Sequence, residues 1–138
     1  MSQPNQRPVF VVTLKNRIVA MDAHSGQRVW EVETIDPQGH GAVQVEQDFV
    51  VHAFKDVATC VRYSDGHVLW RANLPRQFKL APNVMIFAGC VLLANTGEVA
   101  ALHLHTGQLL WHDGFDGYGI YGGAMAAPGV FTRLDRRT

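Results

Sequence analysis

A chain of 138 residues is long enough to build one domain with a buried core, and 47% hydrophobic against 17% charged residues excludes a disordered composition. Twelve basic residues balance twelve acidic ones, so the charge gives no support for nucleic acid or an anionic membrane as a partner. No apolar run approaches the roughly 18 residues of a membrane-spanning helix, which excludes a membrane segment of that kind.

The chain begins with three short strand-like runs. They are rich in β-branched and aromatic residues and are separated by turn residues such as Asn16 and Gly26, a pattern that predicts β-strands. The predicted strands are Val9–Leu14, Ile18–Ala23 and Arg28–Glu33. A polar loop follows over residues 34–39, where Pro and Gly mark a break.

The same order then returns with one strand added in front of it. The second unit predicts strands at His40–Glu46, Phe49–Phe54, Val57–Tyr63 and His67–Leu74. The third predicts strands at Asn83–Ala88, Cys90–Ala94, Glu98–Leu104 and Gln108–His112. Two further runs, Gly122–Ala127 and Val130–Leu134, match the first two strands of a fourth unit. No segment longer than about ten residues has helical periodicity, so we expect an all-β chain.

A glycine and a tryptophan four residues apart mark each of the first three units. The pairs are Gly26 and Trp30, Gly66 and Trp70, and Gly107 and Trp111, and the successive tryptophans lie 40 and 41 residues apart. Four short antiparallel strands repeated at this period are typical of propeller blades, which must stack to bury their faces. We predict a partial β-propeller of about three blades plus two strands, in a single region 1–138: blade 1 about 9–33, blade 2 about 40–74, blade 3 about 83–113 and the start of blade 4 about 122–134.

The segment from Ala20 to Glu31 resembles the tryptophan-docking motif of the quinoprotein, or PQQ-like, β-propellers. That motif runs Ala, any residue, Asp, three of any, Gly, a Lys- or Gln-like residue, two of any, and Trp. The first repeat meets every position, with Ala20, Asp22, Gly26 and Trp30 in the four defining ones.

The other two repeats keep the glycine and tryptophan but depart from the motif elsewhere. The second has Cys60 and Arg62 in the alanine and aspartate positions, and the third keeps Ala101 but has His103 in the aspartate position. The resemblance implies that each indole lies between adjacent blades and hydrogen-bonds to backbone. All three tryptophans are therefore expected to be structurally equivalent and largely buried.

The resemblance implies a fold and leaves the function open, because the family includes PQQ-dependent dehydrogenases, outer-membrane assembly scaffolds and uncharacterised sensor propellers. We expect a non-catalytic module that acts as a protein-interaction or ligand-sensing scaffold, with no enzyme activity in this chain alone. The alternative is a fragment of a PQQ-dependent dehydrogenase whose active site lies on missing blades. Acidic residues are scattered and no Cys-Cys dipeptide exists, so no catalytic, cofactor-binding or metal-binding residue is assigned; PQQ and calcium enter only under the alternative.

Three histidines, His103, His105 and His112, form the one pattern that a metal site could use. We instead expect His103 to fill the polar position of the motif and His105 to lie at the turn, since strand alternation alone explains the pair. The other histidines are expected to be solvated: His24, His40, His52 and His67.

Two other features bear on reactivity and binding. The glycine-rich loop over residues 113–123 makes Tyr118 and Tyr121 candidates for contact with a ligand. Cys60 and Cys90 both lie in apolar strand-like runs, so we expect buried free thiols rather than a disulfide framework.

Three blades and two strands are too few to close a ring, because propellers typically need four to eight blades. The expected partners are therefore other propeller blades, from the same longer chain or from another copy, together with a possible protein partner. A surplus strand at Val130–Leu134 favours the longer chain. The polar start of the sequence predicts a cytoplasmic protein as written, with a periplasmic location open if a leader is missing.

Overall fold

The computed structural model describes residues 8–34, 41–75, 82–95, 97–115 and 124–133, and over these ranges the chain contains strands and no helix. The first sheet holds β1 (Val9–Leu14), β2 (Arg17–Asp22) and β3 (Arg28–Glu33). The second holds β4 (Ala42–Glu46), β5 (Phe49–Phe54), β6 (Val57–Arg62) and β7 (Val68–Asn73). The third holds β8 (Asn83–Phe87), β9 (Cys90–Asn95), β10 (Glu98–His103) and β11 (Leu109–Asp113), and β12 (Ala124–Ala127) pairs with β13 (Val130–Arg133).

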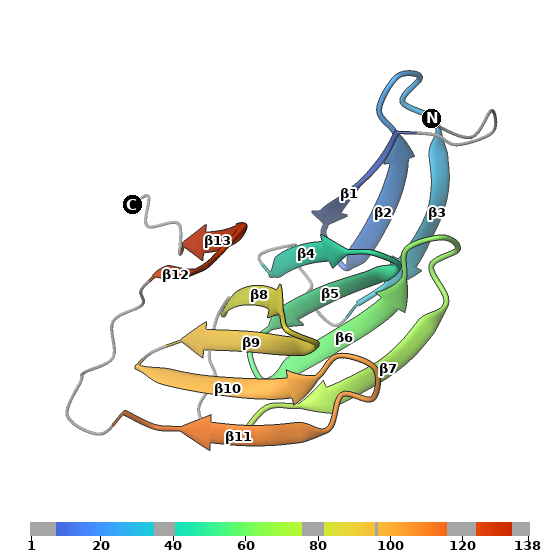
Figure 1. Cartoon of the computed structure of the whole chain (residues 1–138). Coiled ribbons are helices and arrows are strands. Elements are labelled where there is room, and N and C mark those ends of the chain that lie inside the picture. The colour runs from blue at the N-terminus through green and yellow to red at the C-terminus, as the bar shows by residue number, and fades with distance from the viewer. Residues whose placement is uncertain (1–7, 35–40, 76–81, 96, 116–123, 134–138) are drawn as a thin grey trace.

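Each sheet is antiparallel, and its strands lie side by side in chain order, so that β3, β7 and β11 are the last strands of their sheets (Figure 1). Within the described residues the first sheet has three strands, and none of them is equivalent to β4 or β8, as the sequence predicts. The all-β fold expected from the repeat is confirmed. Of the expected fourth unit, residues 122–123 and 134 lie outside the described residues, as does the expected loop over residues 35–39.

In each of the three larger sheets, the pairing of the last strand with its neighbour contains a register shift. The register shifts once between β2 and β3, once between β6 and β7 and once between β10 and β11. After the shift each tryptophan lies directly opposite a small residue: Trp30 opposite Ala20, Trp70 opposite Cys60 and Trp111 opposite Ala101. The alanine position of the motif is thus the cross-strand neighbour of the indole, and a small side chain there leaves room for the ring.

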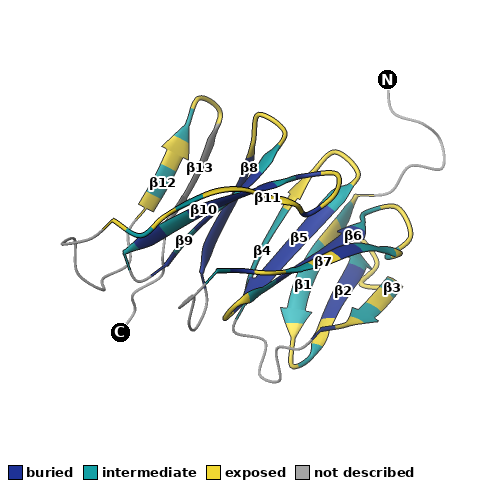
Figure 2. Cartoon of the chain, turned by 90° about the horizontal axis from the view of Figure 1, so that it is seen from below, coloured by how far each residue is buried: buried dark blue, intermediate teal, exposed yellow. Residues whose placement is uncertain are grey.

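The core lies between sheets, because a single four-stranded sheet cannot bury both of its faces. Ile18 of the first sheet packs with Val50 and Val61 of the second. A larger cluster joins the second sheet to the third and includes Trp70 and Leu102. In Figure 2 the buried residues gather on β5 and β8 in the middle of the stack, whereas β12 at one end is intermediate or exposed.

Candidate functional site

The joint between the first two sheets is built around Trp30 on β3. Its indole Nε1 donates a hydrogen bond of 2.8 Å to the backbone oxygen of Tyr63, which directly follows β6. The ring lies over Gly66: a Cβ added there would come within 2.7 Å of Cδ2 of Trp30. The indole therefore clamps the turn that follows β6, using one hydrogen bond and one close ring–backbone contact.

The joint between the second and third sheets repeats this contact. Nε1 of Trp70 donates to the backbone oxygen of Leu104 over 2.8 Å, and a Cβ on Gly107 would lie 2.6 Å from Cδ2 of Trp70. Trp70 is 8% exposed and belongs to the larger core cluster. In both joints the acceptor residue precedes the contacted glycine by three positions, so one geometry serves both.

The third tryptophan does not follow this rule in the described structure. Trp111 is 48% exposed, and its indole has no hydrogen-bond partner among the described residues. The expectation that all three tryptophans are largely buried is wrong for Trp111, and Trp30 is only half-buried. The physical reason is that the described part of the fourth sheet contains β12 and β13, without a following strand and glycine turn to cover the ring.

Tyr63 strengthens the first joint in a way that the sequence analysis did not anticipate. While its backbone oxygen accepts from Trp30, its own hydroxyl donates a 2.7 Å hydrogen bond to the backbone oxygen of Val9. The equivalent positions hold Ala23 and Leu104, which have no such donor. A tyrosine three residues before the motif glycine is the only sequence signal that could have indicated this bond.

Polar side chains at the turns are used to cap backbone N–H groups. Oδ1 of Asp22 accepts from the backbone N–H groups of His24 and Ser25, at 2.8 and 3.0 Å. Nδ1 of His103 accepts from the N–H of His105 at 3.1 Å, so the expectation that His103 fills the aspartate position is confirmed. Both side chains satisfy donors that the turn would otherwise leave to water.

The second unit solves the same problem with a residue from another hairpin. Arg62 occupies the aspartate position and cannot accept a hydrogen bond. Oδ1 of Asp48, in the turn between β4 and β5, instead accepts from the N–H of Ser64 at 2.9 Å. Arg62 is left to pair with Asp65 at 3.1 Å. The backbone N–H of His67, and to a lesser degree the charge of Arg62, hold the pKa of Asp65 below its ordinary value.

The three histidines considered for a metal site have separate surroundings. The ring of His105 meets Phe49 edge-on, with centroids 4.9 Å apart. Nε2 of His112 lies 2.7 Å from Oε1 of the buried Glu98. Within the described ranges no three His, Cys, Asp or Glu side chains gather as a metal-binding group. That the chain has no metal-binding residue stays a prediction.

Three acidic side chains of the described ranges already have other partners. Asp22 caps a turn and Glu31 lies 3.8 Å from Arg17, both on the first sheet, while Glu98 faces His112 on the third, so their oxygens meet different partners. No step of a quinone reaction is therefore assigned to the described residues. Tyr118 and Tyr121, the ligand candidates, lie outside them.

Two further expectations are corrected in part. His52 was expected to be solvated, but it is 1% exposed and packs against Gly41, where a Cβ would clash with its ring. His24 and His67 are exposed as expected, and residue 40 lies outside the described ranges. Cys60 is a buried free thiol whose pKa is raised by burial to about 12. Cys90 is also free but only half-buried.

No helix in the described ranges is long and apolar enough to cross a membrane.

Comparison with known proteins gives one family and a consistent fold. Residues 4–117 match the family model described as "Outer membrane protein assembly factor BamB". The chain is 25% identical over 108 residues to outer membrane protein assembly factor BamB of Yersinia pestis, which covers 75% of this chain and 27% of that protein. It thus spans about a quarter of the length of this curated relative.

Solved structures agree on the fold. BamB from Moraxella catarrhalis matches with a TM-score of 0.62 and 22% identity, over 79% of this chain and 34% of that one. Quinohemoprotein alcohol dehydrogenase from Comamonas testosteroni matches with a TM-score of 0.63 and 18% identity, over 76% of this chain and 19% of that one. At these identities the likeness shows a shared fold, and it includes both a named assembly factor and a named enzyme.

Proposed function

Because this chain belongs to the family of outer membrane protein assembly factor BamB, we propose that it is a non-catalytic propeller module that serves as a scaffold for protein interaction. The single observation that carries the proposal is how the polar side chains are used. Asp22, Asp48 and His103 hold turns together, and Glu98 and His112 pair with each other. Such side chains support the shape of the module rather than a reaction.

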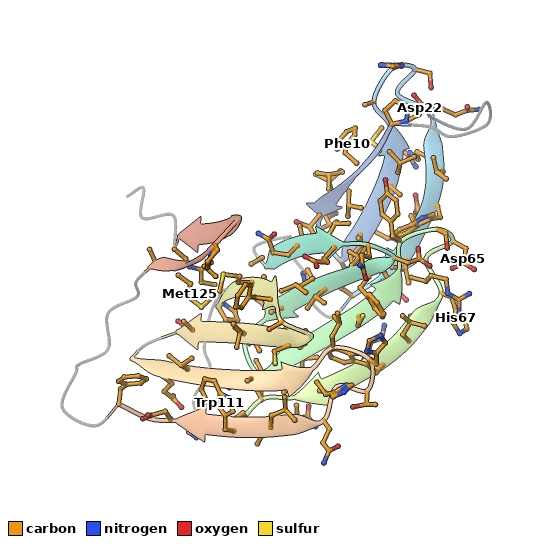
Figure 3. The ribbon with its side chains drawn as sticks, viewed as in Figure 1. Phe10, Asp22, Asp65, His67, Trp111 and Met125 are labelled. Carbon is orange, nitrogen blue, oxygen red and sulfur yellow. The ribbon has the colours of Figure 1, made fainter. Side chains whose placement is uncertain are left out.

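Exposed apolar side chains add support from the outside of the molecule. Large hydrophobic residues are exposed on the first and third sheets, including Phe10 at 47% and Leu110 at 46%. Figure 3 shows Phe10 on the first sheet, far from Trp111 on β11. Apolar surface of this kind is typical of faces that contact other proteins or further blades.

The proposal includes the setting of the module. Further blades, from the same longer chain or another copy, complete the ring. The relative is an outer membrane protein assembly factor, which supports the periplasmic location that the sequence leaves open if a leader is missing. The cytoplasmic expectation receives no support from the comparisons. The ligand-sensing role and a quinoprotein dehydrogenase remain the competing functions.

A two-armed experiment tests the scaffold role. In one arm, a photo-crosslinking side chain at Val45, which is exposed, reports contacts with the purified outer-membrane protein assembly complex. We expect a discrete cross-linked product that excess unlabelled chain removes. In the other arm, PQQ with calcium is titrated against the chain and alcohol-dependent dye reduction is followed. Saturable PQQ binding with dye reduction, and no cross-link, would favour the dehydrogenase and sink the scaffold proposal.

A further inference from the structure

Two Asp-Gly dipeptides lie within the described residues, in different surroundings. Asp65 and Gly66 belong to the turn between β6 and β7 (Figure 3), while Asp113 and Gly114 stand at the end of β11. An aspartate followed by glycine is chemically sensitive, because glycine has no Cβ to keep the aspartate carboxyl away from the next backbone nitrogen.

Both carboxyl groups are held over their own backbone in the same way. Oδ1 of Asp65 accepts from the N–H of His67 at 3.0 Å, and Oδ1 of Asp113 accepts from the N–H of Phe115 at 2.8 Å. In each case the hydrogen bond folds the carboxyl carbon toward the nitrogen of the intervening glycine. The two dipeptides therefore share the proximity that a reaction between these atoms needs.

The docking turn holds Asp65 and Gly66 in an unreactive state. The N–H of Gly66 donates to the backbone oxygen of Arg62 at 2.7 Å, and the ring of Trp30 lies against the same glycine. The N–H of His67, and to a lesser degree the charge of Arg62, lower the pKa of Asp65 and keep its carboxyl ionised. A carboxylate has no hydroxyl that can leave, so it resists attack by an amide nitrogen.

These restraints are missing at Asp113 and Gly114. Thr34 and Leu74, which occupy the place of Phe115 in the first two repeats, donate their N–H groups to the neighbouring hairpin at 2.7 Å. Successive N–H groups of a strand point to opposite edges, so that of Gly114 points away from β10. Among the described residues it has no acceptor, and no basic side chain there pairs with the carboxyl of Asp113.

We propose that Asp113 is a site of spontaneous isoaspartate formation, and that the docking turn shields Asp65 from the same reaction. The nitrogen of Gly114 loses its proton and bonds to Cγ of Asp113, one carboxyl oxygen leaves as water, and a five-membered succinimide forms. Water then adds to the α carbonyl of the ring and breaks its bond to nitrogen. One water is lost and one is regained, so no other reactant is needed.

The product changes the main chain where β11 ends. An isoaspartate runs the backbone through Cβ and Cγ, which adds one main-chain atom and leaves the α carboxylate as a side group. Asp113 pairs with Val99 of β10 and caps the N–H of Phe115, so both contacts are lost in the modified chain. The product is a substrate for the methyltransferases that use S-adenosylmethionine to methylate isoaspartyl carboxylates. The inference does not depend on the proposed scaffold role.

Ageing the chain in two states tests the proposal. One sample is kept folded near neutral pH at physiological temperature, and the other is kept unfolded in guanidinium chloride. Chymotrypsin cuts after Trp111 and Phe115, so the peptide of Asp113 is separated from the neighbouring Asp116, which lies outside the described residues. Electron-transfer fragmentation locates each isoaspartate, and methylation with labelled S-adenosylmethionine counts the total.

We expect severalfold more isoaspartate at Asp113 than at Asp65 in the folded sample. In guanidinium chloride the two yields should become similar, because glycine follows both residues and the restraints on Asp65 are gone. Equal yields in the folded chain would overturn the proposal. So would a folded chain without isoaspartate at Asp113 when the unfolded sample contains it at both positions.

Gly114→Ala gives a second and independent test. The φ of Gly114 lies outside the left-handed region, so alanine fits the backbone, while its methyl group obstructs ring closure. The yield at Asp113 should fall severalfold in both the folded and the unfolded sample. Gly117→Ala is the matched control, since it places the same methyl group after Asp116 and should leave Asp113 unchanged. An unchanged yield at Asp113 in Gly114→Ala would contradict attack by this nitrogen.

Discussion

A turn glycine can be required for two separate reasons, and this chain separates them. Gly107 has a φ of +79° and also lies directly under the ring of Trp70, while Gly89 has a φ of +74° and open space around it. Replacing Gly89 by a residue with a side chain would therefore cost only backbone strain. Replacing Gly107 would cost the same strain and would also press the new side chain against the indole of Trp70, which is held in a packed core.

We expect Gly89→Ala to cost about 1–2 kcal/mol of unfolding free energy from strain in the left-handed region. Gly107→Ala should cost a further 1–3 kcal/mol or so, because the new methyl group overlaps the indole. Urea unfolding of the two variants gives the difference directly. Equal losses would mean that Trp70 moves aside freely, contrary to the docking geometry.

Burial of the Cys60 thiol makes the stability of the fold depend on pH. The pKa of Cys60 rises from its ordinary value of 9.0 to about 12 in the folded chain, because burial disfavours the thiolate. In the unfolded chain the thiol ionises first, so the unfolded state binds fewer protons between these values.

The stability of the fold should therefore be unaffected by Cys60 below pH 9 and fall as the pH rises from about 9 to 12, by up to about 1.4 kcal/mol per pH unit. Urea titrations at pH 8 and pH 10 measure the fall. Cys60→Ala, which has nothing to ionise, should lose less stability over the same interval than the natural chain. A parallel fall in both proteins would exclude Cys60 as the cause.

At the scale of the hairpin, the three repeats reach one turn geometry with different side chains. Asp22 and His103 cap their own turns, while Asp48 reaches across from the neighbouring hairpin to Ser64 because Arg62 cannot accept. The capped backbone is constant and the capping residue is not. A turn of this kind can therefore lose its aspartate without losing its shape.

Asp48→Ala should cost about 1 kcal/mol, since the N–H of Ser64 loses its acceptor. Adding Arg62→Asn should recover most of that loss, because the new amide oxygen stands where Asp22 stands in the first repeat. Urea midpoints of the two single variants and the double variant measure the coupling. Additive losses would contradict the idea that the two positions serve one turn.

The limits of sequence reasoning are visible in the same elements. The strands, the glycine turns and the tryptophan positions could be predicted, because a repeated period and alternating apolar residues are properties of side chains. The acceptors at Tyr63 and Leu104 are backbone oxygens and carry no side-chain signature. The exposure of Trp111 depends on which strands stand opposite, and the burial of His52 depends on a missing side chain at Gly41.

For the molecule as a whole, the two joints between neighbouring sheets differ in strength. Trp70 is buried inside the larger cluster between the second and third sheets, while Trp30 is half-buried in the smaller cluster between the first and second. The first joint gains extra hydrogen bonds from Tyr63 to Val9 and from Arg71 to the backbone oxygen of Glu33. Apolar burial outweighs such partly solvated bonds, so the second joint is the stronger.

The loss of unfolding free energy on replacing each tryptophan by alanine should follow the same order. Trp70→Ala should cost about 3–5 kcal/mol, as for other buried tryptophans, and Trp30→Ala should cost less. Trp111→Ala, at a 48% exposed site, should cost less than about 1 kcal/mol. Urea unfolding of the three variants gives the order. A loss below about 1 kcal/mol for Trp70→Ala would contradict its role between the sheets.

The span of each joint along the chain has a consequence for synthesis. The indole and its acceptor lie 33 residues apart in the first joint and 34 in the second, so every clamp closes a loop of nearly the same modest length. At a translation rate of about 5–20 residues per second, the partner of a tryptophan leaves the ribosome roughly 2–7 s after it. Each blade can be fastened by the next before a third is complete, so a nascent chain has one uncovered tryptophan at a time, on the blade made last.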